Sequence, residues 1–232
     1  MTIKDCTIVI PVFNEDVKAV TKLYSELGMC GFKVIIVDDG SHMEFPDEMY
    51  VISYPANIGY GYAIKQGIKA ADTPIIMTMD GDSQHTVQDA NKLYAIYKMA
   101  EDVKMVVGQR WNLNEKPIRW IGRKILNFIA SCISGHYYSD LNSGMRIFDA
   151  ELAKNYYPIL CDTFSFTTSF TMAMVTDGYK MVYFPINVKP RTYGKSHVKV
   201  IQDGFITIYY ILWIGLALRT RGLRAWLRKL TH

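Results

Sequence analysis

The sequence predicts an α/β domain built on a mostly parallel sheet with helices on both faces. The first half of the chain alternates short apolar runs, typical of buried strands, with segments of helical periodicity. With 232 residues, half of them hydrophobic, the chain is long enough to bury the core of one large domain. Alternation of this kind favours parallel strands joined by crossover helices.

Strand-like runs account for much of the first half. They are Thr7–Val12, Lys33–Val37, Tyr50–Ser53, Pro74–Met79 and Met105–Val107. Helical patterns lie between them, near Val17–Leu27, Tyr62–Ala70 and Val87–Met99. In sheets of this type, ligands bind outside the carboxyl ends of the strands. The polar residues that follow those ends are therefore expected to be neighbours in space.

The second half of the chain is less regular. Helices are expected at Ile118–Ile133 and Phe164–Val175, and Asp140–Phe148 is expected to be a loop leading into a strand. Another strand is expected at Tyr179–Phe184. A polar loop that carries Arg191 and Lys195 follows it.

The C-terminal part of the chain is apolar and then basic. Phe205–Leu218 is an apolar run of 14 residues, about 21 Å long as a helix and short of the ~30 Å needed to cross a bilayer. The next apolar residues repeat at helical spacing between basic ones, at Leu223, Trp226, Leu227 and Leu230. A basic amphipathic helix with a Trp on its apolar face is typical of a membrane interface. The alternative is a terminal helix packed on the domain with a solvated basic face.

Positive charge is concentrated in that segment. The chain has a net charge of +4, and residues 219–232 carry five basic residues and no acid, so the remainder is close to neutral. A basic patch can meet nucleic acid or anionic lipid, and the interleaved Leu and Trp favour lipid over nucleic acid. The four cysteines have no paired or zinc-type spacing, which is typical of reduced thiols in a cytosolic protein.

The acidic triplet Asp80-Gly81-Asp82 stands directly after the apolar run that ends at Met79. Side chains two residues apart in extended chain point to the same side, so the two carboxylates can converge on one cation. Oxygen ligands of this kind suit Mg²⁺ or Mn²⁺. Many acidic turns match such a triplet, so its neighbours decide whether it is a metal site.

A second acidic group, Asp38-Asp39-Gly40-Ser41, follows another predicted strand. Carboxylates at a strand end can accept hydrogen bonds from a nucleobase or ribose, although a solvated turn has the same pattern. Asn57-Ile58-Gly59-Tyr60-Gly61 does not have the glycine spacing of a dinucleotide fingerprint, because Ile64 stands where its third glycine would be. Together the strand ends favour a nucleotide pocket.

Several motifs in a fixed order carry a family resemblance. In chain order they are Thr7–Glu15, Val37–Ser41, Asn57–Gly61, Asp80–His85, Val107–Arg110, Asp140–Arg146 and Arg191–Ser196. The series resembles the family 2 glycosyltransferases with the GT-A fold. Within that family it is most similar to the dolichyl- or polyprenyl-phosphate sugar synthases, the dolichol-phosphate mannosyltransferase-like type. The resemblance covers about residues 5–200.

The resemblance implies a role for each matching residue. The nucleotide pocket would be lined by Pro11, Glu15, Asp38, Asp39, Asn57 and Gly59. The divalent metal would be held by Asp80, Asp82 and Gln84, and the acceptor phosphate by Arg110, Arg119 and Arg123. The sugar site would be shaped by Asp140 and Arg146. The residues acting directly in catalysis would be Asp82, Arg110, Arg191 and Lys195.

The implied function is inverting transfer of a sugar from a GDP- or UDP-linked donor to a polyprenyl phosphate, with Mg²⁺ or Mn²⁺. The GT-A domain would span residues 1–199, and residues 200–232 would form membrane-associating helices. The protein is expected to attach peripherally to the cytoplasmic face of a membrane. Two alternatives are transfer to a saccharide or polysaccharide acceptor, and a nucleotide-sugar-binding subunit without turnover.

The sequence departs from the family pattern at a few positions. Arg123 stands where many relatives carry a small hydroxyl residue, His197 where a lysine is frequent, and Gly81 where alanine is usual. Many bacterial relatives also append paired membrane-spanning helices. Peripheral attachment, or a separate membrane partner protein, is expected to substitute for them here.

Overall fold

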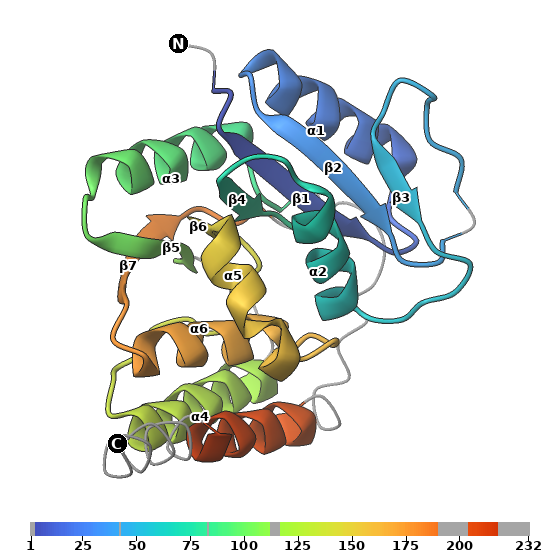
Figure 1. Ribbon diagram of the computed structural model, residues 1–232. Helices are drawn as coiled ribbons and strands as arrows, with labels where there is room; N and C mark the ends of the chain where they lie inside the picture. The colour runs from blue at the N-terminus through green and yellow to red at the C-terminus, as the bar shows by residue number, and fades with distance from the viewer. Residues whose placement is uncertain (1–2, 42, 83, 112–116, 190–203, 218–232) are drawn as a thin grey trace, which may run out of the picture.

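The computed structural model describes residues 3–41, 43–82, 84–111, 117–189 and 204–217 (Figure 1). Within these residues, seven strands form one sheet in the order β3-β2-β1-β4-β6-β5-β7. The strands are β1 (Cys6–Val12), β2 (Lys33–Asp38), β3 (Val51–Ser53), β4 (Ile75–Thr78), β5 (Val103–Arg110), β6 (Arg146–Asp149) and β7 (Lys180–Ile186). Neighbouring strands are parallel except at β6, which is antiparallel to β4 and β5. The predicted α/β class is confirmed.

Helices cover both faces of the sheet (Figure 1). They are α1 (Val17–Met29), α2 (Tyr60–Ala70), α3 (Val87–Met99), α4 (Pro117–Ser134), α5 (Ala150–Tyr156) and α6 (Phe166–Thr176), with a 3₁₀ turn at Tyr157–Ile159 and a helix over residues 204–217. α1 and α3 lie on one face and α2, α5 and α6 on the other. α4 and the helix 204–217 lie side by side below α6, as a further layer (Figure 1).

The sheet separates two hydrophobic cores because alternate residues of a strand point to opposite faces. In β1, Ile8 and Ile10 pack toward α1 and α3, whereas Val9 packs toward α2. All seven β1 residues are buried, which explains why this strand is apolar apart from Thr7 and has no polar alternation.

The differences from the sequence-based expectation lie in the second half. β6 lies where a strand is expected. Its antiparallel direction results from pairing with β4 and β5, and nothing in the residues of β6 itself indicates that direction. α5 was not expected, because seven residues are too few to establish a helical period. Its N-cap is Asp149, whose carboxylate accepts a hydrogen bond from the Leu152 amide at 2.8 Å.

No helix within the described residues is both long and apolar enough to span a bilayer. The helix 204–217 coincides with most of the apolar run that was predicted from the sequence. The basic segment 219–232 lies outside the described residues, as do Arg191 and Lys195.

Candidate active site

The acidic turn at Asp80–Asp82 lies at the carboxyl edge of the sheet, directly after β4. The Asp80 side chain is 31% exposed, and Asp82 is buried with its Oδ1 accepting a hydrogen bond from the Gln84 amide at 3.1 Å. Gly81 packs against β1 so closely that a Cβ there would lie 2.7 Å from Val12 Cγ1. A residue with a Cβ at this position would require Val12 to shift, so Gly81 allows the turn to lie close against β1.

The Asp80 carboxylate is held from two sides. The Tyr60 hydroxyl donates to Oδ1 at 3.0 Å, and His85 Nε2 lies 3.5 Å from Oδ2. Burial by itself raises the pKa of Asp80, but the hydrogen bond and charge of His85, the Tyr60 hydroxyl and the charge of Arg110 together bring that pKa below its ordinary value. Asp80 is therefore ionised at neutral pH, which is the state in which a carboxylate binds a cation.

Gly144 closes the site behind Asp80. A Cβ on Gly144 would overlap both carboxylate oxygens and lie 2.6 Å from Asp80 Cγ. The Gly144 carbonyl is fixed in turn by the Thr78 hydroxyl, at 2.6 Å. Sequence reasoning did not identify Gly144 or Tyr60 as site residues. The glycine in Asn142-Ser143-Gly144 could have indicated a close contact at this position. Its contact with Asp80, however, depends on the pairing of β4 with β6.

Gln84 joins the acidic turn to the chain that follows β7. Its Nε2 donates to the Lys189 carbonyl at 3.1 Å, and the Lys189 amide donates to the Gln84 carbonyl at 3.0 Å. The side-chain oxygen is consequently turned away from that carbonyl. Across the part of the chain that the structure describes, no three His, Cys, Asp or Glu side chains form a metal-binding group. The oxygen groups at this turn that could hold a divalent cation are the Asp80 and Asp82 carboxylates and the side-chain amide of Gln84.

The predicted nucleotide residues are brought to the adjoining strand ends. Asp39 accepts hydrogen bonds from the Ile58 and Gly59 amides, each at 2.8 Å, so that the 56–59 turn packs on the end of β2. Asp38 Oδ1 accepts from the Ser41 amide at 3.0 Å. Pro11 is buried in β1, Glu15 is half-buried beyond it, and Asn57 is exposed. As expected from the strand order, these residues lie at the same edge as Asp80.

Arg110, at the end of β5, is paired with the buried Asp140. Its Nε and Nη2 donate to the two carboxylate oxygens at 2.8 and 2.7 Å. Burial alone raises the pKa of Asp140, but the charge and hydrogen bonds of Arg110, with a smaller contribution from Arg123, hold it below the ordinary value. Arg119 lies four residues before Arg123 on α4, so both share one helix face. Arg110 and Arg123 thus both act on Asp140, and the Arg110 side chain is 21% exposed.

We expect Asp140→Asn to lower the free energy of unfolding at neutral pH by about 3 kcal/mol, because it leaves a largely buried guanidinium without its counter-charge. The folded-state pKa of Asp140 lies below its usual 3.8. The stabilisation is therefore present above about pH 4 and is lost as the pH falls through the folded-state value. Urea unfolding between pH 3 and pH 7 measures this dependence. Asp72→Asn, which removes the charge of an exposed partner of Lys33, should leave this pH dependence and the stability at neutral pH nearly unchanged.

Arg146, predicted to shape the sugar site, is fully buried. Its guanidinium donates to the carbonyls of Leu141, Ser143 and Thr167 and to the Thr171 hydroxyl. Burial lowers the pKa of Arg146 to about 10, which leaves it charged at neutral pH. Its contacts tie the 141–143 loop to α6, so it supports the loop that carries Asp140 and Gly144.

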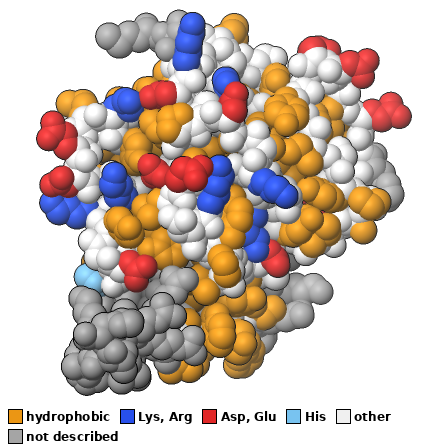
Figure 2. Space-filling model, in the orientation of Figure 1, with side chains coloured by type: hydrophobic (Ala, Val, Ile, Leu, Met, Phe, Trp, Pro, Cys, Tyr) orange, Lys and Arg blue, Asp and Glu red, His pale blue; other side chains and the backbone are white. Residues whose placement is uncertain are grey.

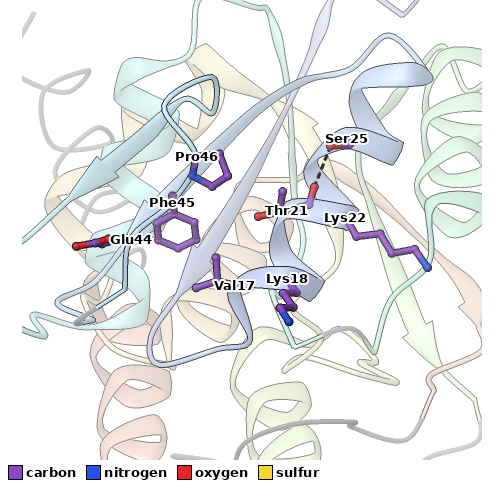
Figure 3. A pocket seen from close by; sticks show the side chains of 8 residues that line it. All are labelled: Val17, Lys18, Thr21, Lys22, Ser25, Glu44, Phe45 and Pro46. Atoms are coloured by element: carbon purple, nitrogen blue, oxygen red, sulfur yellow. Dashed lines mark hydrogen bonds between the residues drawn. The ribbon is translucent and has the colours of Figure 1, made fainter.

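A separate depression lies between α1 and the segment at residues 44–46 (Figure 3). It has a volume of about 580 Å³, and its lining residues are Val17, Lys18, Thr21, Lys22, Ser25, Glu44, Phe45 and Pro46. None of the predicted site residues lines it. The candidate chemistry is instead concentrated at the strand ends around Asp80 and Asp140.

Comparisons with known proteins identify the family and the fold of this chain. The family model described as Glycosyl transferase family 2 matches residues 7–157. An uncharacterized protein of Methanocaldococcus jannaschii is 29% identical over 88% of this chain and 90% of its own length. The glycosyltransferase AglJ of Haloferax volcanii is 24% identical over 87% of this chain and 70% of its own length.

An undecaprenyl-phosphate 4-deoxy-4-formamido-L-arabinose transferase of Photorhabdus laumondii is 27% identical over 70% of this chain, and the match spans 57% of that relative. Among solved structures, glucosyl-3-phosphoglycerate synthase of Mycobacterium tuberculosis superimposes with a TM-score of 0.73 at 13% identity, over 91% of this chain and 80% of that one. That protein was crystallised with Mn²⁺, UDP-glucose and phosphoglyceric acid. The match confirms the GT-A fold, and by its sequence the chain belongs to glycosyl transferase family 2.

Proposed function

We propose that this chain transfers a sugar from a nucleoside-diphosphate donor to a polyprenyl phosphate at a membrane surface. The observation that carries the proposal is the placement of three groups along one sheet edge. The turn bound by Asp39, where a nucleotide would lie, follows β2. Asp80 and Asp82 follow β4, two strands further along the sheet, and Arg110 stands at the end of β5. A donor diphosphate at the acidic turn would have the nucleotide turn on one side and the arginines on the other.

The donor set at the acidic turn fits a hard divalent cation such as Mg²⁺ or Mn²⁺. Asp80 and Asp82 supply carboxylate oxygens, and the side-chain amide of Gln84 supplies a neutral oxygen. Substrate phosphate and water usually complete sites of this kind. When bound, the cation would supply positive charge to the donor diphosphate as it leaves. The chain's own contribution is to hold the carboxylate oxygens in place, through the backbone N–H of Gln84 at Asp82 and through the Tyr60 hydroxyl and Gly144 at Asp80.

The arginine region suits an acceptor that is itself a phosphate. A planar guanidinium matches two phosphate oxygens at once, which favours Arg119 and Arg123 over lysines at this position. Arg110, whose Nε and Nη2 donate to Asp140, would add positive charge beside them. A phosphate is already an anionic nucleophile at neutral pH, so no strong general base is required. Arg191 and Lys195, outside the described residues, would add charge over the donor phosphates. The names of relatives such as the undecaprenyl-phosphate transferases support this class of acceptor.

A large apolar surface supports the choice of a lipid acceptor. The apolar helix pair, defined as α4 and the helix 204–217, exposes large hydrophobic side chains at Ile118, Trp120, Ile121, Ile125, Phe128, Phe205, Tyr209, Leu212, Trp213 and Leu216. Figure 2 shows hydrophobic side chains gathered in the lower part of the molecule, where Figure 1 places these helices. Trp side chains beside basic residues are typical of interfacial helices, and Lys124 lies 6.0 Å from the Trp120 ring.

We expect the Leu212→Gln/Leu216→Gln double variant to bind vesicles of phosphatidylcholine and phosphatidylglycerol about tenfold more weakly, because two exposed leucines no longer enter the interface. Vesicle co-sedimentation measures this change. The control is Met29→Gln/Met99→Gln, which removes two side chains of even greater exposure from α1 and α3, on other parts of the molecule. Equal loss in both variants, or no loss in either, would contradict a lipid-facing role for the helix pair.

The proposed function is tested by incubating the purified protein with membranes, Mg²⁺ or Mn²⁺, and a panel of labelled UDP- and GDP-sugars. With the unsubstituted chain, label should enter the organic-extractable fraction. With the Asp82→Ala variant, no label should enter that fraction. Label found only in polymeric or water-soluble products would indicate a saccharide or small phosphorylated acceptor instead. Donor binding without any transfer would indicate a binding subunit.

A further inference from the structure

Tyr60, the first residue of α2, contacts the acidic turn directly. Its hydroxyl donates to Asp80 Oδ1 at 3.0 Å, and its ring stacks on that of Phe164, with centroids 5.3 Å apart and planes inclined by 18°. The side chain is thus fixed at both ends, by a carboxylate at the hydroxyl and by an aromatic face along the ring. Neither contact belongs to the nucleotide or acceptor groups described above.

The backbone around Tyr60 is equally constrained. Gly59 has a φ of +141°, a conformation that other residues rarely adopt. A Cβ on Gly59 would overlap the Asp162 carbonyl, and one on Gly61 would lie 2.8 Å from Phe166 Cβ. The Tyr62 amide donates to the same Asp162 carbonyl at 2.9 Å. The start of α2 is therefore pressed against the 161–166 segment, which leaves the Tyr60 side chain little freedom to move.

The segment that carries Phe164 is tied to the helix 204–217 through the residue that follows it. Its neighbour Ser165 is buried and hydrogen-bonded through Oγ to Thr207 Oγ1 of the helix 204–217, at 2.8 Å. The Phe164 side chain itself remains partly exposed, beside the ring of Tyr60. A continuous path of contacts consequently runs from that helix through Ser165, Phe164 and Tyr60 to Asp80.

We propose that Tyr60 is a positioning residue that fixes the orientation of the Asp80 carboxylate for cation binding. With Tyr60 on Oδ1, His85 near Oδ2 and Gly144 behind it, the carboxylate has a defined rotation about its Cβ–Cγ bond. Outer hydrogen bonds of this kind orient metal ligands, and their removal weakens metal affinity or activity by about 10- to 100-fold. The inference rests on the proposed function, because it assumes that Asp80 binds a divalent cation.

The test measures Mn²⁺ binding by electron paramagnetic resonance, in the presence of UDP or GDP and without any acceptor. Tyr60→Phe keeps the ring and its stacking but removes the hydroxyl, and we expect its Kd for Mn²⁺ to rise about tenfold. Phe164→Leu, which keeps the hydroxyl but removes the stacking ring, should raise the Kd by a smaller factor. Asp80→Asn should abolish specific binding.

The matched control is Tyr94→Phe, because the Tyr94 hydroxyl also donates to a carboxylate, that of Asp5, at 2.7 Å. Asp5 precedes β1 and lies at the opposite edge of the sheet. Tyr94→Phe should leave the Kd for Mn²⁺ unchanged, even where its thermal midpoint falls as much as that of Tyr60→Phe. Binding abolished by Asp80→Asn but unaffected by Tyr60→Phe would overturn the positioning role alone. Absence of Mn²⁺ binding in the unsubstituted chain would overturn the proposed metal site and this inference together.

Discussion

The Asp82→Asn variant is expected to lose at least about 100-fold in kcat/KM for sugar transfer, because it removes one of the two negative charges at the acidic turn. The substitution is close to isosteric, and its side-chain oxygen can still accept the hydrogen bond that Asp82 Oδ1 receives from the Gln84 amide. The turn should therefore keep its shape while its affinity for a cation falls. The loss should be accompanied by weaker binding of Mn²⁺ in the presence of the donor.

Asp72→Asn is the control for this variant. Asp72 precedes β4 at the other end of the strand and is paired with Lys33 through an exposed contact. Its substitution should leave kcat/KM within about twofold, because exposed ion pairs contribute little. Transfer that survives Asp82→Asn at the unsubstituted rate would refute a functional role for the acidic turn, provided that thermal unfolding shows both variants to be folded.

Gly144→Ala is expected to have the second largest effect, although the added group is a single methyl. The methyl would occupy the space of the Asp80 carboxylate, and the Gly144 carbonyl is anchored by the Thr78 hydroxyl, so the glycine has little room to retreat. Asp80 must then rotate out of its position between Tyr60 and His85. We expect kcat/KM to fall about 100-fold, with a loss of about 1–3 kcal/mol in the free energy of unfolding from overpacking.

Gly28→Ala separates this steric effect from a general effect of replacing glycine. No atom lies within 4 Å of a Cβ built on Gly28, which is in α1. That substitution should stabilise the protein by about 0.5–1 kcal/mol, since alanine favours helix, and should leave transfer unchanged. Steady-state kinetics and urea unfolding on both variants give the comparison. Gly144→Ala with unaltered kcat/KM would show that the position of Asp80 is unimportant for the reaction.

Features that depend on local sequence were predicted well. The strands β1, β2 and β4 are buried except at Lys33, so their residues are mostly apolar, and the acidic residues near their carboxyl ends mark where each apolar run stops. The edge of the sheet that carries the site follows from this pattern, because parallel strands end together. The apolar run ahead of the basic segment was also recognised, and it forms a helix.

Features that depend on distant partners could not be predicted from residue patterns. Arg110 and Asp140 are 30 residues apart, and their pairing depends on β5 and the loop before β6 meeting in space. The family resemblance implied a sugar-site role for Arg146, but no residue pattern showed that it is buried, with carbonyls of α6 and the 141–143 loop accepting from its guanidinium. The contact of Gly144 with Asp80 likewise requires the antiparallel pairing of β6 with β4.

Some of the sequence-based expectations remain predictions. The roles of Arg191 and Lys195 and the membrane role of residues 219–232 fall outside the described part of the chain. Arg119 and Arg123 are carried by α4, whose exposed apolar face would bring them close to a lipid surface. An acceptor phosphate at the level of the lipid headgroups would then be within reach of these arginines, which is why the apolar helix pair and the arginine region belong to one proposal.

The most direct measurement is the mass of the product formed from a defined polyprenyl phosphate in vesicles, with the matching nucleotide-sugar and Mg²⁺ or Mn²⁺. We expect a lipid heavier by one dehydrated sugar unit with its single phosphate unchanged, together with release of the nucleoside diphosphate. A lipid that gains a second phosphate would mean transfer of a sugar phosphate instead. A polyprenyl phosphate left unmodified, while a water-soluble acceptor gains the sugar, would contradict the central claim.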